Sequence, residues 1–119
     1  MININNLFVI SDIHGHYEEF KQLLDFWKKE DELVLLGDLI DRGPNSLRVI
    51  EKVMALKKIY GDQVTFIKGN HEDMLLNYLN NPIEKREHYF KHGGKETMDN
   101  FLATLSPSEN VSNEDEMND

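Results

Sequence analysis

The sequence predicts an α/β fold with a mostly parallel sheet, in the order strand, helix, strand, helix, strand, helix. Two observations support this prediction. Three short apolar runs alternate with longer segments whose apolar residues recur at helical spacing. Each apolar run is also followed directly by polar residues of types that bind ligands or take part in catalysis. Ligand sites in parallel sheets gather at the carboxyl ends of the strands. A length of 119 residues suits one domain.

The strands are the three apolar runs. They are LFVIS at 7–11, ELVLLG at 32–37 and QVTFIKG at 63–69. Each is only a few residues long and two of them end in glycine, as expected of strands buried in a sheet and followed by turns. Because a helix separates each pair, right-handed crossovers are expected to make the strands parallel.

The helices are predicted from their apolar spacing. They cover residues 16–29, residues 44–61, a segment that begins with 72–79, and a last region at about 84–105. In the first of them, Tyr17, Phe20 and Trp27 fall on one helical face. The second starts with a proline and ends with a glycine, as helices commonly do. Gly93 and Gly94 interrupt the last region.

Composition excludes several classes of protein. The net charge of −9 argues against a general nucleic-acid binder. No apolar run approaches the roughly 20 residues of a membrane helix. The absence of cysteine excludes disulfides and thiolate metal sites, and we expect a cytoplasmic protein. Residues 106–119 hold five acids and no base, which predicts an acidic disordered tail after a domain at 1–105.

Seven polar residues follow the three predicted strands and should converge at one edge of the sheet. They are Asp12 and His14 after the first strand, Asp38, Asp41 and Arg42 after the second, and Asn70 and His71 after the third. Taken singly, each has a structural explanation, because short polar residues cap helices and form turns. Caps alone need no histidine, no arginine and no repetition at three strand ends, which favours a functional site.

Asp12, His14 and Asp38 form a plausible ligand set for a divalent metal. Two carboxylates and an imidazole suit manganese, iron or zinc better than calcium, which prefers oxygen. Asn70 adds an amide oxygen, and Asp38 is able to bridge two cations. Such a two-metal centre binds phosphate and lowers the pKa of a bridging water.

Asp41, His71 and Arg42 add a second chemical function. Asp41 is expected to orient the imidazole of His71, which would then act as a general acid toward a leaving oxygen. Arg42 offers a planar fork for phosphate oxygens.

The three polar segments resemble motifs of the calcineurin-like metallophosphoesterases. SDIHGH at 11–16 looks like the D-x-H-G block, GDLIDRG at 37–43 like G-D-x-x-D-R-G, and GNHED at 69–73 like G-N-H-E. Within this superfamily, the D-R-G and G-N-H-E motifs resemble those of the serine/threonine phosphoprotein phosphatases. YFKHGGKET at 89–97 is similar, more loosely, to the W-x-x-N-G-G-x-x-T stretch of the phage-lambda type, with Tyr89 and His92 in place of Trp and Asn.

This resemblance implies a role for each of the seven residues. Asp12 and His14 would bind a first metal, and Asp38 would bridge the two metals. Asn70 would bind the second metal and contact the substrate phosphate, which Arg42 would also bind. His71 and Asp41 would be the catalytic residues. The implied cofactors are two divalent ions, with manganese expected and iron or zinc as alternatives. Glu72 and Asp73 are assigned only to the start of a helix, where acids suit the dipole.

The resemblance covers roughly residues 7–104 and implies the N-terminal half of the family's α/β sandwich. Family members continue further and supply two more histidines to the second metal, so that site would be incomplete in this chain. The second sheet of the sandwich would also be missing. One apolar sheet face would then be exposed, or would bind a homodimer partner or a complementary fragment.

Three functions follow from this interpretation. The first is metal-dependent hydrolysis of phosphomonoesters, with phosphoserine or phosphothreonine in proteins as substrate and a metal-activated water as nucleophile. The second is hydrolysis of dinucleoside polyphosphates such as diadenosine tetraphosphate. The third is a catalytically incomplete fragment that binds metal or a partner protein.

Overall fold

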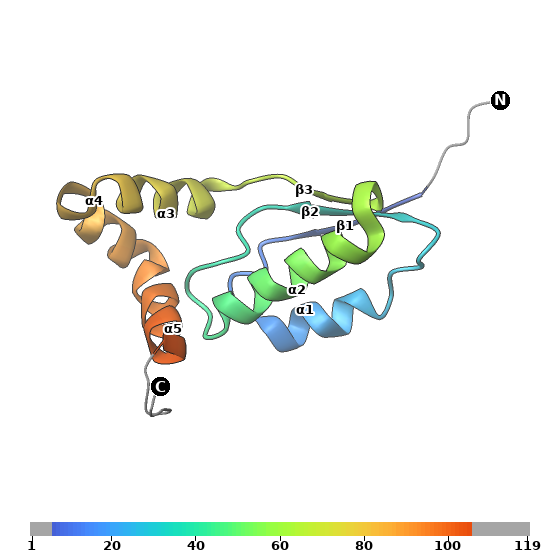
Figure 1. The fold of residues 1–119 in the computed structure, drawn as a ribbon, viewed down its shortest axis with the longest axis horizontal. Helices are drawn as coiled ribbons and strands as arrows, with labels where there is room; N and C mark the ends of the chain where they lie inside the picture. The colour runs from blue at the N-terminus through green and yellow to red at the C-terminus, as the bar shows by residue number, and fades with distance from the viewer. Residues whose placement is uncertain (1–5, 106–119) are drawn as a thin grey trace.

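The computed structural model describes residues 6–105 and confirms the α/β class, with three parallel strands in the order β1-β2-β3 (Figure 1). The strands are β1 (Leu7–Ser11), β2 (Glu32–Leu36) and β3 (Val64–Phe66). Leu35 pairs with Ile10 on one side and with Phe66 on the other. The tail predicted at 106–119 lies outside the described residues.

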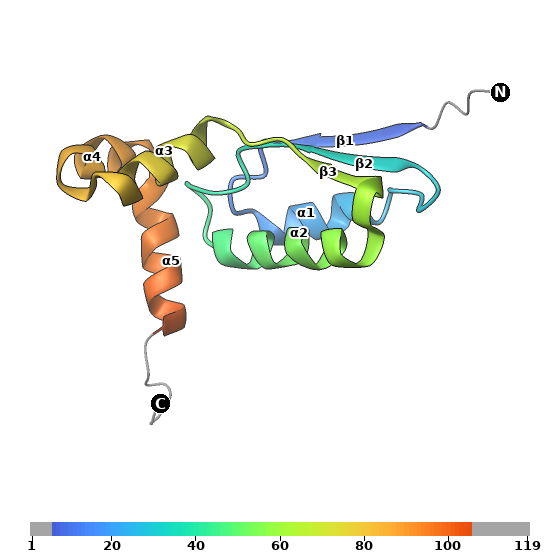
Figure 2. The same cartoon turned by 45° about the horizontal axis from the view of Figure 1, so that its top comes forward.

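The connecting helices lie on the same face of the sheet. They are α1 (Tyr17–Leu24) and α2 (Ser46–Tyr60), and the short turn η1 (Gly61–Gln63) leads from α2 into β3. Figure 2 shows both helices below the sheet. Leu33, Leu35 and Val64 point toward them and are fully buried, so this layer is the hydrophobic core.

The opposite face of the sheet is open across the described residues. Leu7, Val9 and Ile67 are each exposed by half or more, and Leu36 is 44% exposed. Side chains of a strand alternate between faces, so Leu7, Val9 and Leu36 lie opposite the core residues of β1 and β2, and Ile67 follows directly after β3. The exposed apolar face expected from the sequence is therefore present.

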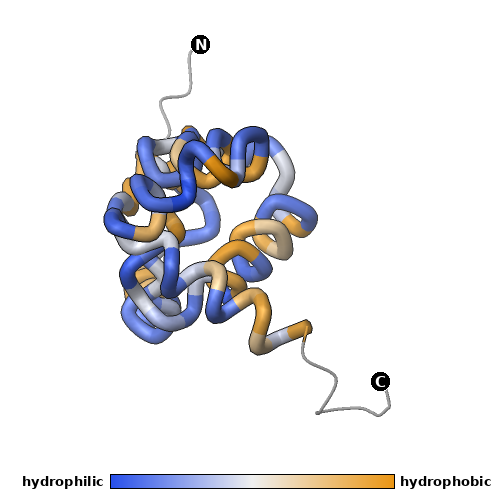
Figure 3. Tube along the Cα trace, turned by 90° about the vertical axis from the view of Figure 1, so that its left-hand side faces the viewer, coloured by the Kyte–Doolittle hydropathy of each residue, from blue (hydrophilic) through white to orange (hydrophobic). Residues whose placement is uncertain are grey.

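A second group of helices follows β3 and lies beyond the carboxyl ends of the strands (Figure 1). Its members are α3 (Asn70–Asn80), α4 (Pro82–Tyr89), η2 (Phe90–Gly94) and α5 (Lys95–Leu105). The predicted interruption is real, since Gly93 adopts φ +101° within η2. Figure 3 shows hydrophobic colour at the end of α5, where Leu102 and Leu105 are exposed. No helix between residues 6 and 105 has the length and apolar character of a membrane span.

Several boundaries differ from the sequence prediction, and two of the differences affect the core and the strand-end loops. The helix predicted over 16–29 ends at Leu24, because the next three amides, of residues 25–27, bond carbonyls only three residues back. Trp27 still reaches the core, and its indole Nε1–H donates to the carbonyl of Asp31 at 2.9 Å. The helix expected from Glu72 begins earlier, at Asn70, so His71 lies in the first turn of α3.

Candidate functional site

The loops after β1, β2 and β3 meet at one edge of the sheet, and their backbone is strained. Within residues 6–105 the non-glycine residues with positive φ are all predicted site residues: Asp12 (56°), His14 (46°), Asp38 (53°), Asp41 (77°) and Arg42 (74°). Few residues other than glycine adopt this conformation, and arginine is not among the residue types that are enriched in it. Backbone strain of this kind clusters at functional sites, where the surrounding structure must hold it in place.

The structure brings Asp12, His14 and Asp38 together. One ligand atom from each residue lies within 4.8 Å of the others, a separation that a single cation can span. Asp12 is exposed, whereas His14 and Asp38 are half-buried. Two carboxylate oxygens and one imidazole nitrogen, from the loops after β1 and β2, fit a divalent transition metal such as manganese, iron or zinc.

The orientation of His14 supports this fit. Its Nδ1 lies 2.9 Å from the carbonyl oxygen of Ile40. A carbonyl only accepts hydrogen bonds, so Nδ1 carries a proton, and in the neutral form of the ring Nε2 is the nitrogen with the lone pair. Nε2 is the atom that lies 3.8 Å from the carboxylate of Asp12. Fixing the second ring nitrogen on a backbone carbonyl is the usual way in which proteins orient a metal-binding histidine.

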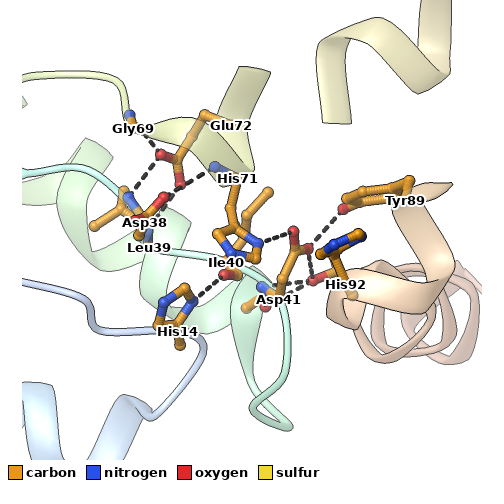
Figure 4. Close-up of polar contacts among 12 residues, drawn as sticks. His14, Asp38, Leu39, Ile40, Asp41, Gly69, His71, Glu72, Tyr89 and His92 are labelled. Atoms are coloured by element: carbon orange, nitrogen blue, oxygen red, sulfur yellow. Dashed lines mark hydrogen bonds and ion pairs between the residues drawn. The ribbon is translucent and has the colours of Figure 1, made fainter. Parts of the chain in front are cut away.

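His71 and Asp41 form a buried pair beside the metal-ligand group (Figure 4). His71 Nδ1 lies 2.8 Å from Asp41 Oδ2, and the Asp41 side chain is fully buried. The rings of His71 and His14 meet edge to face, with centroids 4.7 Å apart. The pair predicted from the sequence is therefore in contact, and the carboxylate can orient the imidazole.

The other oxygen of Asp41 receives two hydroxyl groups that sequence reasoning missed. Tyr89 Oη donates to Asp41 Oδ1 at 2.6 Å, and Thr97 Oγ1 donates to the same oxygen at 2.7 Å. The amide of Asp41 lies 2.9 Å from Thr97 Oγ1 and 3.1 Å from Ser46 Oγ. All of these groups are buried, and both oxygens of the Asp41 carboxyl group and its amide have hydrogen-bond partners there.

This arrangement keeps Tyr89 protonated. Burial raises the pKa of the Tyr89 hydroxyl far above its ordinary value, and its hydrogen bond to the Asp41 carboxylate raises it further. A neutral phenol is the form that donates to Asp41. The sequence did contain an indication of this contact, because Tyr89 and Thr97 stand at the first and last positions of the stretch that resembles W-x-x-N-G-G-x-x-T.

Arg42 and Asn70 are placed at the same edge with exposed side chains. The amide of Arg42 donates to the carbonyl of Gly93 at 2.9 Å. That contact is close: a Cβ on Gly93 would lie 2.5 Å from Arg42 Cγ. Asn70 is the first residue of α3, and Gly69 before it packs against Asp38. No hydrogen bond within residues 6–105 fixes either side chain, so their roles remain predictions.

Glu72 is the other residue whose part in the site the sequence did not predict. It lies in the first turn of α3, and its carboxylate accepts the amide of Gly69 at 2.8 Å, as an acid does in a capping box. The same carboxylate also accepts the amides of Asp38 and Leu39, each at 2.7 Å. Those two residues belong to the loop after β2, more than 30 positions earlier.

Comparison with known proteins gives a consistent picture. The profile of the calcineurin-like phosphoesterases matches residues 6–116. The chain is 41% identical over 87 residues to the symmetrical bis(5'-nucleosyl)-tetraphosphatase of Buchnera aphidicola, covering 70% of the chain and 30% of that relative. It is 35% identical over 105 residues to the enzyme of the same name from Glaesserella parasuis, covering 82% of the chain and 37% of that relative.

A relative with a different name also matches. The chain is 38% identical over 73 residues to a putative serine/threonine-protein phosphatase of Caenorhabditis elegans, covering 60% of the chain and 20% of that protein. The chain thus spans about a third or less of the length of these curated relatives. Each of these relatives carries the name of a phosphatase.

Proposed function

The chain belongs to the calcineurin-like phosphoesterase family, and on that premise we propose that it is a phosphatase with dinucleoside tetraphosphates as its substrate class, cleaved at a phosphoanhydride bond. The observation that carries the proposal is the convergence of two groups at one sheet edge. The donor atoms of Asp12, His14 and Asp38 lie within 4.8 Å of one another, and the His14 ring among them contacts His71 of the Asp41 pair.

The substrate class reverses the order expected from the sequence, which placed phosphoproteins first. Two relatives named symmetrical tetraphosphatases match 70% and 82% of the chain, whereas the putative protein phosphatase matches 60%. The phage-lambda-type assignment has no support among these relatives. Phosphoprotein hydrolysis stays as the second candidate because of the Caenorhabditis elegans match and the Glu72 that follows Gly69-Asn70-His71.

The family implies divalent metals, and Asp12, His14, Asp38 and Asn70 are the residues that would hold them. Such ions, when bound, supply positive charge to a phosphate and make a water more acidic. The chain's own residues then have defined tasks. Arg42 offers its guanidinium to phosphate oxygens. His71, held at Nδ1 by Asp41, keeps Nε2 for a proton that passes to the leaving oxygen.

The two candidate substrates place different demands on His71. Symmetrical cleavage of a tetraphosphate releases a diphosphate oxygen, and the second pKa of a phosphate lies at about 6. Serine released from a phosphopeptide is a far more basic leaving group and needs a proton in the transition state. Replacing His71 should therefore slow phosphopeptide hydrolysis much more than tetraphosphate hydrolysis.

The test compares both substrates with the purified 119-residue chain and Mn²⁺. Diadenosine tetraphosphate and a phosphoserine peptide would be offered separately, with ADP and inorganic phosphate measured as products, and with EDTA and His71→Asn as controls. We expect metal-dependent formation of ADP that EDTA abolishes. Faster release of phosphate from the peptide would favour the second candidate. A folded, Mn²⁺-binding chain that hydrolyses neither would contradict the proposed activity.

A further inference from the structure

The carboxylate of Glu72 joins two of the loops that carry the candidate metal ligands. Its Oε1 accepts the amides of Asp38 (2.7 Å) and Gly69 (2.8 Å), and its Oε2 accepts the amide of Leu39 (2.7 Å). Figure 4 shows these bonds on one side of Asp38. Asp38 and Leu39 follow β2, whereas Gly69 follows β3, so the Glu72 side chain connects the loops after these two strands.

The conformation of the β2 loop depends on such an acceptor. Gly37 and Asp38 both have positive φ, at 66° and 53°. Glycine adopts this conformation freely, but at Asp38 it is strained and must be held by its surroundings. The amides of Asp38 and Leu39 both point at Glu72, and a carboxylate with two oxygens can accept both.

The two loops are also unusually close. A Cβ on Gly37 would lie 2.4 Å from the Gly69 nitrogen, and a Cβ on Gly69 would lie 2.6 Å from Asp38 Oδ1. The amide of His71 then donates to Asp38 Oδ1 at 2.9 Å. Asp38 is therefore held twice: Glu72 fixes its backbone, and the first turn of α3 fixes its carboxylate.

An acid in the first turn of a helix has a simpler explanation, which is interaction with the helix dipole. Asp73 provides the comparison within the same turn. It is exposed and pairs with Lys68 at 2.9 Å, and it makes no hydrogen bond to the other loops of the described chain. The dipole applies to both acids, whereas only Glu72 bonds the amides of Asp38 and Leu39.

We infer that Glu72 is a positioning residue that holds Asp38 in its strained conformation and so prearranges the metal-ligand group. The inference rests on the proposed metal-dependent function. Glu72 does not contact the other ligands or substrate in this role. It acts through the backbone of Asp38, as outer groups around metal sites commonly act through the ligands they hold.

The experiment starts with the metal-free 119-residue chain, in which amide hydrogen exchange is measured residue by residue. The amides of Asp38 and Leu39 should exchange slowly although both lie outside every helix and strand. In Glu72→Gln the side chain keeps one accepting oxygen and turns an NH₂ group toward a backbone donor. Exchange at Asp38 and Leu39 should then be about tenfold faster or more, because their opening no longer breaks a bond to a carboxylate.

Mn²⁺ titration by calorimetry supplies the second readout. Glu72→Gln should bind Mn²⁺ about tenfold or more weakly, by analogy with other outer-group variants of metal sites. Asp73→Asn removes the same charge one residue away and should leave both the exchange rates and the affinity near wild type. Glu72→Asp keeps the charge and both oxygens but reaches less far, so it should resemble Glu72→Gln.

Three results would overturn the inference. Fast exchange of Asp38 and Leu39 in the wild-type chain would show that the bonds do not form, and this measurement needs no variant to fold. Unchanged amide exchange and unchanged Mn²⁺ affinity in Glu72→Gln or Glu72→Asp would show that the hydrogen bonds of Glu72 do not fix the conformation of Asp38. An equal loss of affinity in Asp73→Asn would assign the effect to net charge. Failure of the wild-type chain to bind Mn²⁺ would instead contradict the proposed function, while exchange would still test the bonds.

Discussion

Tyr89→Phe is the substitution that tests the buried network around Asp41 most directly. It removes one oxygen atom and leaves the ring, which stacks on Tyr78 with centroids 5.4 Å apart and is fully buried. The atom removed is the donor of the 2.6 Å hydrogen bond to Asp41 Oδ1. The aromatic ring itself is kept, so any effect should come from the loss of that bond.

The expected cost follows from the partners that remain. A hydrogen bond to a charged group contributes about 1.5–3 kcal/mol. Asp41 Oδ1 keeps the hydroxyl of Thr97 at 2.7 Å and Oδ2 keeps His71, so the carboxylate is not left without donors. The loss should therefore fall near the lower end of that range, at about 1.5–2 kcal/mol. A larger loss is expected for Thr97→Val, since Thr97 Oγ1 bonds both the carboxylate and the amide of Asp41.

The assay is urea unfolding at pH 7, followed by circular dichroism, with Tyr78→Phe as the matched control. Tyr78 loses the same atom in that variant, but its hydroxyl makes no hydrogen bond within residues 6–105. We expect the control to stay within about 0.5 kcal/mol of wild type. Because the stability of a domain is only about 5–15 kcal/mol, the loss in Tyr89→Phe should be well resolved.

The contribution of the Tyr89–Asp41 hydrogen bond to stability should change with pH in a definite direction. The pKa of Tyr89 is raised in the folded protein, so above its ordinary value of 10.0 the unfolded chain releases this proton first. The folded state then binds more protons than the unfolded state, and stability falls as pH rises above that value. The contribution of Tyr89 is thus fully present at pH 7 and is lost progressively in the alkaline range. The difference between wild type and Tyr89→Phe should shrink from pH 9 to pH 11.

The reasoning would be refuted by a Tyr89→Phe variant as stable as the Tyr78→Phe control at pH 7. That result would mean that the hydroxyl of Tyr89 bonds water, or nothing, instead of Asp41. A stability difference that grew above pH 10 would contradict the sign of the pKa shift.

Two further predictions concern the sheet and the phosphate site. Leu35→Ala should cost about 2–5 kcal/mol, because Leu35 is fully buried, whereas Leu36→Gln on the open face should cost about 0.5 kcal/mol or less. Urea unfolding of the two variants checks this, and a similar loss in both would show that the open face is covered. Arg42→Ala should weaken orthovanadate binding in the presence of Mn²⁺ about tenfold, and Arg42→Lys should restore only part of it, since a single ammonium lacks the planar fork. Calorimetry at constant ionic strength checks this, and equal affinity in the three proteins would remove Arg42 from the phosphate site.

Much of the fold was predictable because it depends on local periodicity. Alternation of short apolar runs with helical spacing fixes strands, helices and a parallel sheet, and the carboxyl edge then follows from the connections. At Trp27, however, the apolar spacing predicted the wrong local structure. Its spacing from Tyr17 and Phe20 fits a helical face, but the chain leaves the helix at Leu24 and a tight turn returns the indole to the core.

The convergence of the candidate residues was predictable, but the side chains that hold their loops in place were not. Asp12, His14, Asp38 and Asp41 follow strands, so their convergence can be inferred from the order of elements. The donors to Asp41 lie 48 and 56 positions away, on α4 and α5, and those to Glu72 lie up to 34 positions away. Local spacing contains no information about such pairs. A capping acid at Glu72 has the same sequence pattern whether or not its second oxygen reaches another loop.

The strained residues explain why those distant supports exist. Each of the five left-handed residues would relax if its loop were free, at a gain of about 1–2 kcal/mol for a residue without special side-chain compensation. The structure opposes this at several points: Glu72 holds Asp38, Tyr89 and Thr97 hold Asp41, and the carbonyl of Gly93 holds Arg42.

All of those holding groups lie in α3, α4, η2 or α5, outside the sheet and its two covering helices. The second helical group therefore has a function beyond packing. The strands bring the candidate ligands to one edge, and the helices that follow fix the backbone angles at which Asp38, Asp41 and Arg42 are presented. A substitution in α4 or α5 can thus alter the geometry of this edge without touching any candidate ligand, while the sheet and its core remain intact.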